Sequence, residues 1–190
     1  SWDIHAARIS PDGTVLDPEG FPVSFSSGAE SNPGIACGSG QCLVVWEDDR
    51  NADVDIYAAR IDTTGTVLDP AGIPLTSGGG DEARPQAGFN GTDFVVVWGD
   101  SRNGNSEIFT TRVDADGNAS DPCGVMIAAG DRNLEYPSVG GGPAGRNLIV
   151  YNGFVEDTYR STRAWGLFVG EDASLIFADG FESGDTSTWN

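Results

Sequence analysis

The chain repeats itself at an interval of 52 residues, and this period limits its fold more than any other feature. A segment at 42–62 reads CLVVWEDDRNADVDIYAARID, and it returns at 94–114 as FVVVWGDSRNGNSEIFTTRVD. The second half of the same segment opens the chain as WDIHAARIS. Ile4, Ile56 and Ile108 align without slippage, since 56 − 4 = 52 and 108 − 56 = 52. A period near 50 residues is typical of propellers and repeat arrays.

Each repeat divides into four short apolar runs separated by turn signals. In the second copy, residues 87–89 and 94–98 flank an Asn-Gly step, and the runs 107–113 and 125–128 follow. Asn-Gly and Asp-Gly steps between alternating runs indicate hairpins. We therefore expect an all-β fold, a β-propeller-like array of about three and a half four-stranded antiparallel units in a single repeat domain. The expected parts are an N-terminal half unit (1–31), unit 1 (32–83), unit 2 (84–135), a degenerate unit 3 (136–178) and a C-terminal tail (179–190).

The charge balance argues against two classes of partner. The chain has 29 acidic and 10 basic residues, which gives a formal net charge of −19. Such a surface repels phosphate backbones and anionic lipid heads, so nucleic acid is not an expected partner. No apolar run approaches the roughly 18 residues that a membrane span needs, so membrane insertion is not expected either. Because no signal-peptide pattern opens the chain, we interpret it as a mature product or a piece of a longer chain.

Paired charges recur in successive units. Asp48 with Arg50 returns as Asp100 with Arg102, and each pair is followed by a strand arginine. Such groups could form a catalytic or acidic-sugar site, but a catalytic site is usually built once. Repetition favours structural ion pairs, in which the planar guanidinium holds a carboxylate. The residues expected in these repeated pairs are Asp48, Arg50, Arg60, Asp100, Arg102 and Arg112.

One aromatic residue holds the same register in each unit. Trp46, Trp98 and Tyr151 end apolar strands, and they could stack on sugar rings or pack between units. Their apolar neighbours favour an aromatic core.

Two cysteines flank a hairpin tip. Cys37 and Cys42 occupy the positions that Phe89 and Phe94 hold one period later, so their side chains should face each other. We expect a Cys37–Cys42 disulfide, which fits an oxidising compartment, and we expect Cys123 to stay unpaired within the chain.

Two further patterns could mark a metal site and glycosylation sites, but ordinary turns also explain both. Asp114, Asp116 and Asn118 alternate oxygen ligands that could hold Ca²⁺, but their counterparts are hairpin turns and no EF-hand glutamate follows. We therefore expect no metal and no cofactor, with Ca²⁺ at this turn as the alternative. Asn90 and Asn118 fit the glycosylation sequon, although a turn position explains both asparagines.

The repeats resemble a known group of tandem repeats. They look like propeller-like repeats of secreted bacterial proteins, and the likeness covers nearly all of residues 1–150. It is carried by the motifs DIYAARID (55–62), VLDPAGIPL (67–75) and VVWGDSR (96–102). The ending LIFADGFESGDTSTWN (175–190) is similar to a C-terminal tail of secreted or surface proteins of Gram-negative bacteria. The resemblance implies an extracellular or cell-surface bacterial location. It supplies no catalytic residue.

These patterns lead to a structural hypothesis. The half unit lacks two strands that every other unit has, and an unpaired sheet edge invites strand addition by another chain. We expect an extracellular, non-enzymatic structural protein that self-associates head-to-tail into a filament, with residues 1–10 against a neighbouring chain. The alternative is a glycan-binding, lectin-like propeller. No catalytic residue is assigned: there is a single histidine and no nucleophile motif, although the acidic pairs leave a carboxylate-only glycosidase open.

Overall fold

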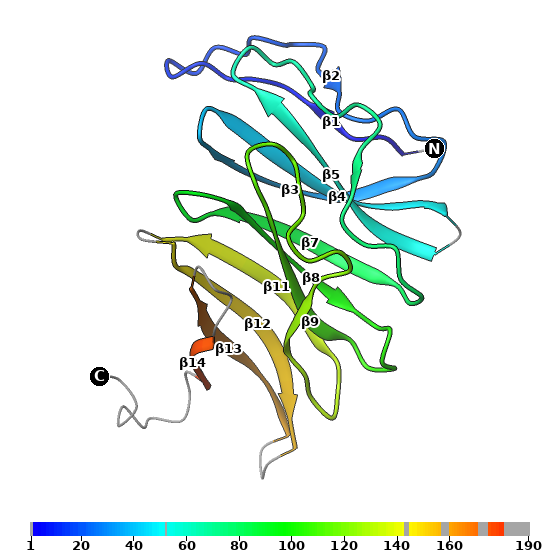
Figure 1. Cartoon of the computed structure of the whole chain (residues 1–190), viewed down its shortest axis with the longest axis vertical. Coiled ribbons are helices and arrows are strands. Elements are labelled where there is room, and N and C mark those ends of the chain that lie inside the picture. Colours follow the sequence, from blue (N-terminus) through cyan, green and yellow to red (C-terminus); the bar gives the residue numbers. More distant parts are fainter. Residues whose placement is uncertain (1, 52, 143–144, 157–159, 171–174, 181–190) are drawn as a thin grey trace.

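A computed structural model describes residues 2–51, 53–142, 145–156, 160–170 and 175–180, and it confirms the expected all-β fold (Figure 1). The half unit contains a two-stranded ribbon of β1 (His5–Ala6) and β2 (Phe21–Pro22). Unit 1 contains β3 (Glu30–Gly38), β4 (Gln41–Asn51), β5 (Asp53–Asp62) and β6 (Ile73–Pro74). Unit 2 contains β7 (Glu82–Phe89), β8 (Phe94–Asp100), β9 (Glu107–Val113) and β10 (Val125–Ala128). Unit 3 contains β11 (Leu134–Gly141), β12 (Asn147–Val155), β13 (Ser161–Val169) and β14 (Leu175–Gly180).

The sheets are arranged as the blades of a partial β-propeller. Strands within each sheet follow chain order and pair antiparallel, as hairpin connections require. The first strands of neighbouring units pack together, β7 lying between β3 and β11, so these three are the inner strands. The half unit and unit 3 lie at opposite ends of the molecule (Figure 1).

Each central sheet is buried on both faces. Side chains alternate along a strand, so Val44 and Trp46 of β4 face the half unit, whereas Leu43 and Val45 face unit 2. All four are buried. This explains why the V-V-W runs are continuously apolar.

The N-terminal segment packs on its own chain. Ile4 is buried in a cluster with Val23 and Trp46, and the Trp2 carbonyl accepts a hydrogen bond from the Glu30 amide at 2.8 Å. The expectation that residues 1–10 lie against a neighbouring chain is therefore not supported, because Ile4 and the Trp2 carbonyl are already engaged within the chain.

The C-terminal tail expected from the sequence lies mostly outside the residues that the structure describes. The expected tail at 179–190 lies outside the described residues after Gly180. Among the described residues, no helix has the length and apolarity that crossing a bilayer requires.

The disulfide expected at the β3–β4 hairpin is confirmed. Cys37 and Cys42 face each other across the two strands and are bonded, while Cys123 is free. In unit 2 the same place holds Phe89 and Phe94, whose ring centroids are 5.1 Å apart. One covalent and one aromatic pair thus close equivalent hairpins.

We predict a modest contribution from this disulfide. Replacing Cys37 and Cys42 with alanine should lower the free energy of unfolding by at most about 2 kcal/mol, because the closed loop is short. Denaturant unfolding with and without reductant measures this, and reductant should affect only proteins that retain the pair. Cys123→Ala is the control and should leave stability unchanged. A double variant that still responds to reductant would contradict the assignment.

Candidate functional site

A buried polar cluster lies between neighbouring units and is built twice. Asp48 accepts hydrogen bonds from Trp46 Nε1 at 3.1 Å and from Arg50 Nη2 at 2.5 Å, and its side chain has no exposed surface. Asp100 and Arg102 form the equivalent ion pair. Burial raises the pKa of Asp48, but the hydrogen bonds from the Arg50 side chain, Trp46 and the Arg50 amide together hold that pKa below its ordinary value. Asp48 is thus neutralised by residues of its own strand, β4, and its charge is not presented to a ligand.

The strand arginines belong to a different pair. Arg60 binds Asp69, with Nε 2.8 Å from Oδ2, and Arg8 binds Asp17 in the same way. Arg60 was expected beside Asp48, and the structure does not bring these two into an ion pair. Arg112 holds the equivalent strand position in unit 2.

Glu82 is a member of the inter-unit cluster that sequence reasoning missed. Its side chain is fully buried, and Oε2 accepts a hydrogen bond from Thr76 Oγ1 at 2.9 Å. The pKa of Glu82 is raised to about 7, first by burial and then by the charges of Asp100 and Asp55, against the opposing effects of Thr76 and Arg102. The available signal was the period itself, because Glu30 stands 52 residues earlier.

This raised pKa predicts a loss of stability with rising pH. The folded state binds the Glu82 proton more tightly than the unfolded state, so the contribution is complete below the ordinary pKa of 4.5 and is lost as pH rises through about 7. The full effect is on the order of 3 kcal/mol. Glu82→Gln should therefore flatten the stability profile between pH 4.5 and 8 and raise stability at pH 8.

Denaturant unfolding across this pH range measures the effect. Glu19→Gln, at an exposed position, is the matched control and should reproduce the wild-type slope. A Glu82→Gln profile as steep as wild type would show that Glu82 does not hold the proton.

Unit 3 lacks this cluster. Leu134 stands where unit 2 has Glu82, and Gly153 pairs with Leu134 as Asp100 pairs with Glu82. At Gly153 a Cβ would lie 3.0 Å from the Leu134 side chain and 3.1 Å from Trp165 Nε1, so a larger residue would crowd this corner. The repeated ion pair is thus absent where the unit departs from the pattern.

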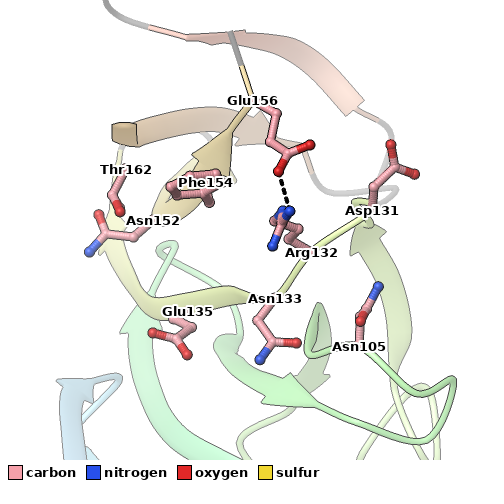
Figure 2. Close-up of a pocket in the computed structure, with 10 residues that line it drawn as sticks. Asn105, Asp131, Arg132, Asn133, Glu135, Asn152, Phe154, Glu156 and Thr162 are labelled. Atoms are coloured by element: carbon pink, nitrogen blue, oxygen red, sulfur yellow. Dashed lines mark hydrogen bonds and ion pairs between the residues drawn. The ribbon is translucent and has the colours of Figure 1, made fainter. Parts of the chain in front are cut away.

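A cavity of about 780 Å³ opens at the same place, between units 2 and 3 (Figure 2). Its walls come from the β8–β9 loop, the segment before and at the start of β11, the end of β12 and the start of β13. The lining residues are Asn105, Asp131, Arg132, Asn133, Glu135, Asn152, Gly153, Phe154, Glu156 and Thr162.

Short contacts hold the walls of the cavity together. Asn133 Oδ1 accepts a hydrogen bond from the Ser106 amide at 3.0 Å, and Ser106 Oγ donates to the Leu134 carbonyl at 2.9 Å. An ion pair joins Arg132 to Glu156 across the opening (Figure 2). These contacts fix the loop of unit 2 against unit 3.

The lining combines polar groups with one aromatic ring. The Arg132 guanidinium carbon lies 5.2 Å from the Phe154 ring centroid, and Phe154 keeps 36% of its surface exposed. Asp131 and Glu135 form no ion pair with any arginine in the described part of the chain. Figure 2 shows these two carboxylates apart, with Arg132 and Asn133 between them. The cavity therefore offers uncommitted carboxylates, amides and an exposed ring.

None of the residues singled out in the sequence lines this cavity. Trp46 and Trp98 are fully buried and Tyr151 is half-buried, so the two tryptophans cannot form a sugar platform. Asn90 is 2% exposed, and its Oδ1 accepts the backbone N–H groups of Thr92 and Asp93.

The turn proposed for Ca²⁺ is closed by its own hydrogen bonds. Asp114 Oδ1 accepts from the amides of Asp116 at 2.9 Å and Asn118 at 2.8 Å. Across the described residues, no group of three or more acidic, histidine or cysteine side chains is placed to hold a metal.

Comparison with known proteins shows the fold. No family model matches the sequence, so the resemblance to named repeats is not supported at that level, and no curated protein matches in sequence. A neuraminidase-like protein of A/little yellow-shouldered bat/Guatemala aligns with a TM-score of 0.52 and 11% identity, over 82% of this chain and 44% of its own. A protein of Bacteroides thetaiotaomicron that is designated a glycosidase aligns with a TM-score of 0.51 and 12% identity, over 88% of this chain and 59% of its own. The chain thus spans about half the length of these solved structures.

This comparison corrects two expectations. We expected a non-enzymatic structural protein that self-associates, because its charges and strands are repeated. The same fold occurs in a protein designated a glycosidase, so a repeated four-stranded architecture is no ground for excluding an enzyme, and the expectation of a purely structural, inactive protein is contradicted. Head-to-tail polymerisation has no support either, since the N-terminal segment is already packed on its own chain.

Proposed function

We propose that the chain binds a glycan in the cavity between units 2 and 3. The observation that carries this proposal is the composition of the cavity wall, in which uncommitted carboxylates and amides surround the exposed ring of Phe154. Sugars present hydroxyl groups to polar side chains and an apolar face to an aromatic ring. The volume of about 780 Å³ lies within the range of roughly 300–1,000 Å³ that is common for small-molecule sites.

Hydrolysis of a glycosidic bond is the second candidate function. Glycoside hydrolysis needs two carboxyl groups that flank the bond, one as acid and one as base or nucleophile. Asp131 and Glu135 are free of ion pairs in the described part of the chain, whereas Glu156 is committed to Arg132. We assign the acid and base roles to Asp131 and Glu135. The occurrence of the same fold in a protein designated a glycosidase supports this assignment.

An extracellular location is part of the same proposal. The Cys37–Cys42 disulfide supports it, because such bonds persist in oxidising compartments.

Phe154→Ala tests the binding site. Loss of the ring should weaken binding of neutral oligosaccharides about fivefold, because stacking on an aromatic face is worth on the order of 1 kcal/mol. Calorimetric titration with arabino-, xylo- and manno-oligosaccharides measures the affinity.

Phe168→Ala is the matched control for this test. Phe168 is 37% exposed, close to the 36% of Phe154, but it does not line the cavity. It should bind like wild type. Equal losses in both variants, or no binding by wild type to any of the three sugar classes, would contradict the cavity assignment.

Glu135→Gln and Asp131→Asn test hydrolysis separately from binding. If these carboxyls are the acid and base, each change should reduce the release of reducing ends at least about a hundredfold, which is typical of a lost general acid or base. The dissociation constant should change little. Wild-type protein that binds but never cleaves would leave recognition standing and remove the hydrolytic function.

A further inference from the structure

The inner strands share an unusual backbone feature. One residue in each has a left-handed φ: 51° at Asn32, 55° at Arg84 and 54° at Tyr136. These positions are 52 residues apart, and each immediately precedes a proline. Each also lies within a register shift of its strand pairing, as expected for a bulge. Non-glycine residues rarely adopt such angles, and they are concentrated at functional sites.

The bulge is constant while the side chain that it carries varies. Asn32, Arg84 and Tyr136 are all exposed, and Tyr136 keeps 55% of its surface accessible. Bulges of this kind re-aim a side chain. Proline is tolerated here because an inner strand is the edge of its sheet, where a missing N–H breaks no ladder. The repeated backbone therefore presents three different functional groups from three neighbouring units.

Glu47 and a cation–π contact link the three bulge residues Asn32, Arg84 and Tyr136 into a row, which we call the inner row. Glu47 Oε2 accepts a hydrogen bond from Asn32 Nδ2 at 2.8 Å, and Oε1 accepts the Arg84 amide at 2.7 Å. Ser31 Oγ also donates to Glu47 Oε2 at 3.2 Å. Both oxygens of Glu47 thus hold the two bulges in place. Arg84 continues the row, with its guanidinium carbon 4.1 Å from the centroid of the Tyr136 ring.

Arg84 is an uncommitted cation in an acidic protein. Its Nη2 lies 3.5 Å from the Tyr136 hydroxyl, and it forms no ion pair with a carboxylate in the described part of the chain. By contrast Arg8, Arg50 and Arg102 are each paired. A guanidinium that lies over a ring and has no carboxylate partner keeps N–H groups available for two parallel hydrogen bonds to a carboxylate.

The inner row adjoins the glycan cavity. Glu135 lines the cavity and Tyr136 is the next residue of β11, so the row begins one residue beyond the cavity wall. A ligand that binds both places must continue from the cavity wall at Glu135 to the ring of Tyr136.

We propose that the inner row binds the carboxylate of a uronic-acid residue in an otherwise neutral glycan. Arg84 pairs with the carboxylate, Tyr136 stacks on the sugar face and the Asn32 amide lies beside the ring hydroxyls. This proposal rests on the proposed function, because the cavity holds the neutral part of the chain. A polyanionic glycan does not fit, since a net charge of −19 repels it as a whole.

A matched pair of ligands tests the proposal. One is a neutral oligosaccharide that carries a single glucuronate, and the other is its carboxyl-reduced form, which differs only in that group. Wild type should bind the acidic form at least about tenfold more tightly, as a charge-assisted pair provides. Arg84→Met should bring the affinity ratio close to one and leave binding of the reduced form unchanged.

Arg146→Met is the matched control, because it removes one exposed arginine that lies outside the inner row and the cavity. It should keep the wild-type ratio. If wild type binds both ligands equally, or if Arg84→Met keeps the ratio, the inner row does not read a carboxylate and the glycan cavity still stands. If wild type binds neither ligand, the proposed function itself fails.

Discussion

Burial of both faces of each central sheet is the constraint on which the rest of the structure depends. Strand β4 has Val44 on one face and Val45 on the other, and both are buried. A four-stranded sheet with two apolar faces must be covered on both sides, so units stack in series. The same requirement pulls Ile4 and Val23 of the half unit onto unit 1. An end that is satisfied within its own chain has less need of a second copy.

When the apolar faces stack, some charged side chains are buried between the units. These charges must be neutralised by partners within the protein. Asp48 and Asp100 are fully buried and each is held by an arginine two residues later. Removing such a charge from water is costly unless it is paired and hydrogen-bonded, which explains why the pair is repeated with the fold. Glu82 has no close ion pair, since Arg102 Nη2 is 4.0 Å away, and burial raises its pKa instead. The repetition of charge is therefore a property of the scaffold.

The proposed binding surface lies where the repeat changes. Unit 3 replaces the Glu82 position with Leu134 and the Asp100 position with Gly153, and the cavity lies there. At the inner row the backbone repeats but the side chains do not. We argued from repetition that the chain is structural, and that argument was wrong because repetition identifies only the residues that serve the scaffold. Residues that break the pattern are the ones free to bind a ligand.

The sequence by itself determined the unit and its main contacts. The 52-residue period specified four-stranded blades, and the replacement of Phe89 and Phe94 by Cys37 and Cys42 specified the disulfide. These features are local or periodic, so spacing alone carries them. The cavity and the inner row were decided only by tertiary structure, because Asn105, Arg132 and Glu156 come from separate loops that meet when unit 3 packs on unit 2. Likewise, no sequence pattern shows that a bulge turns Arg84 toward Tyr136, since that contact joins residues 52 positions apart through the packing of two inner strands.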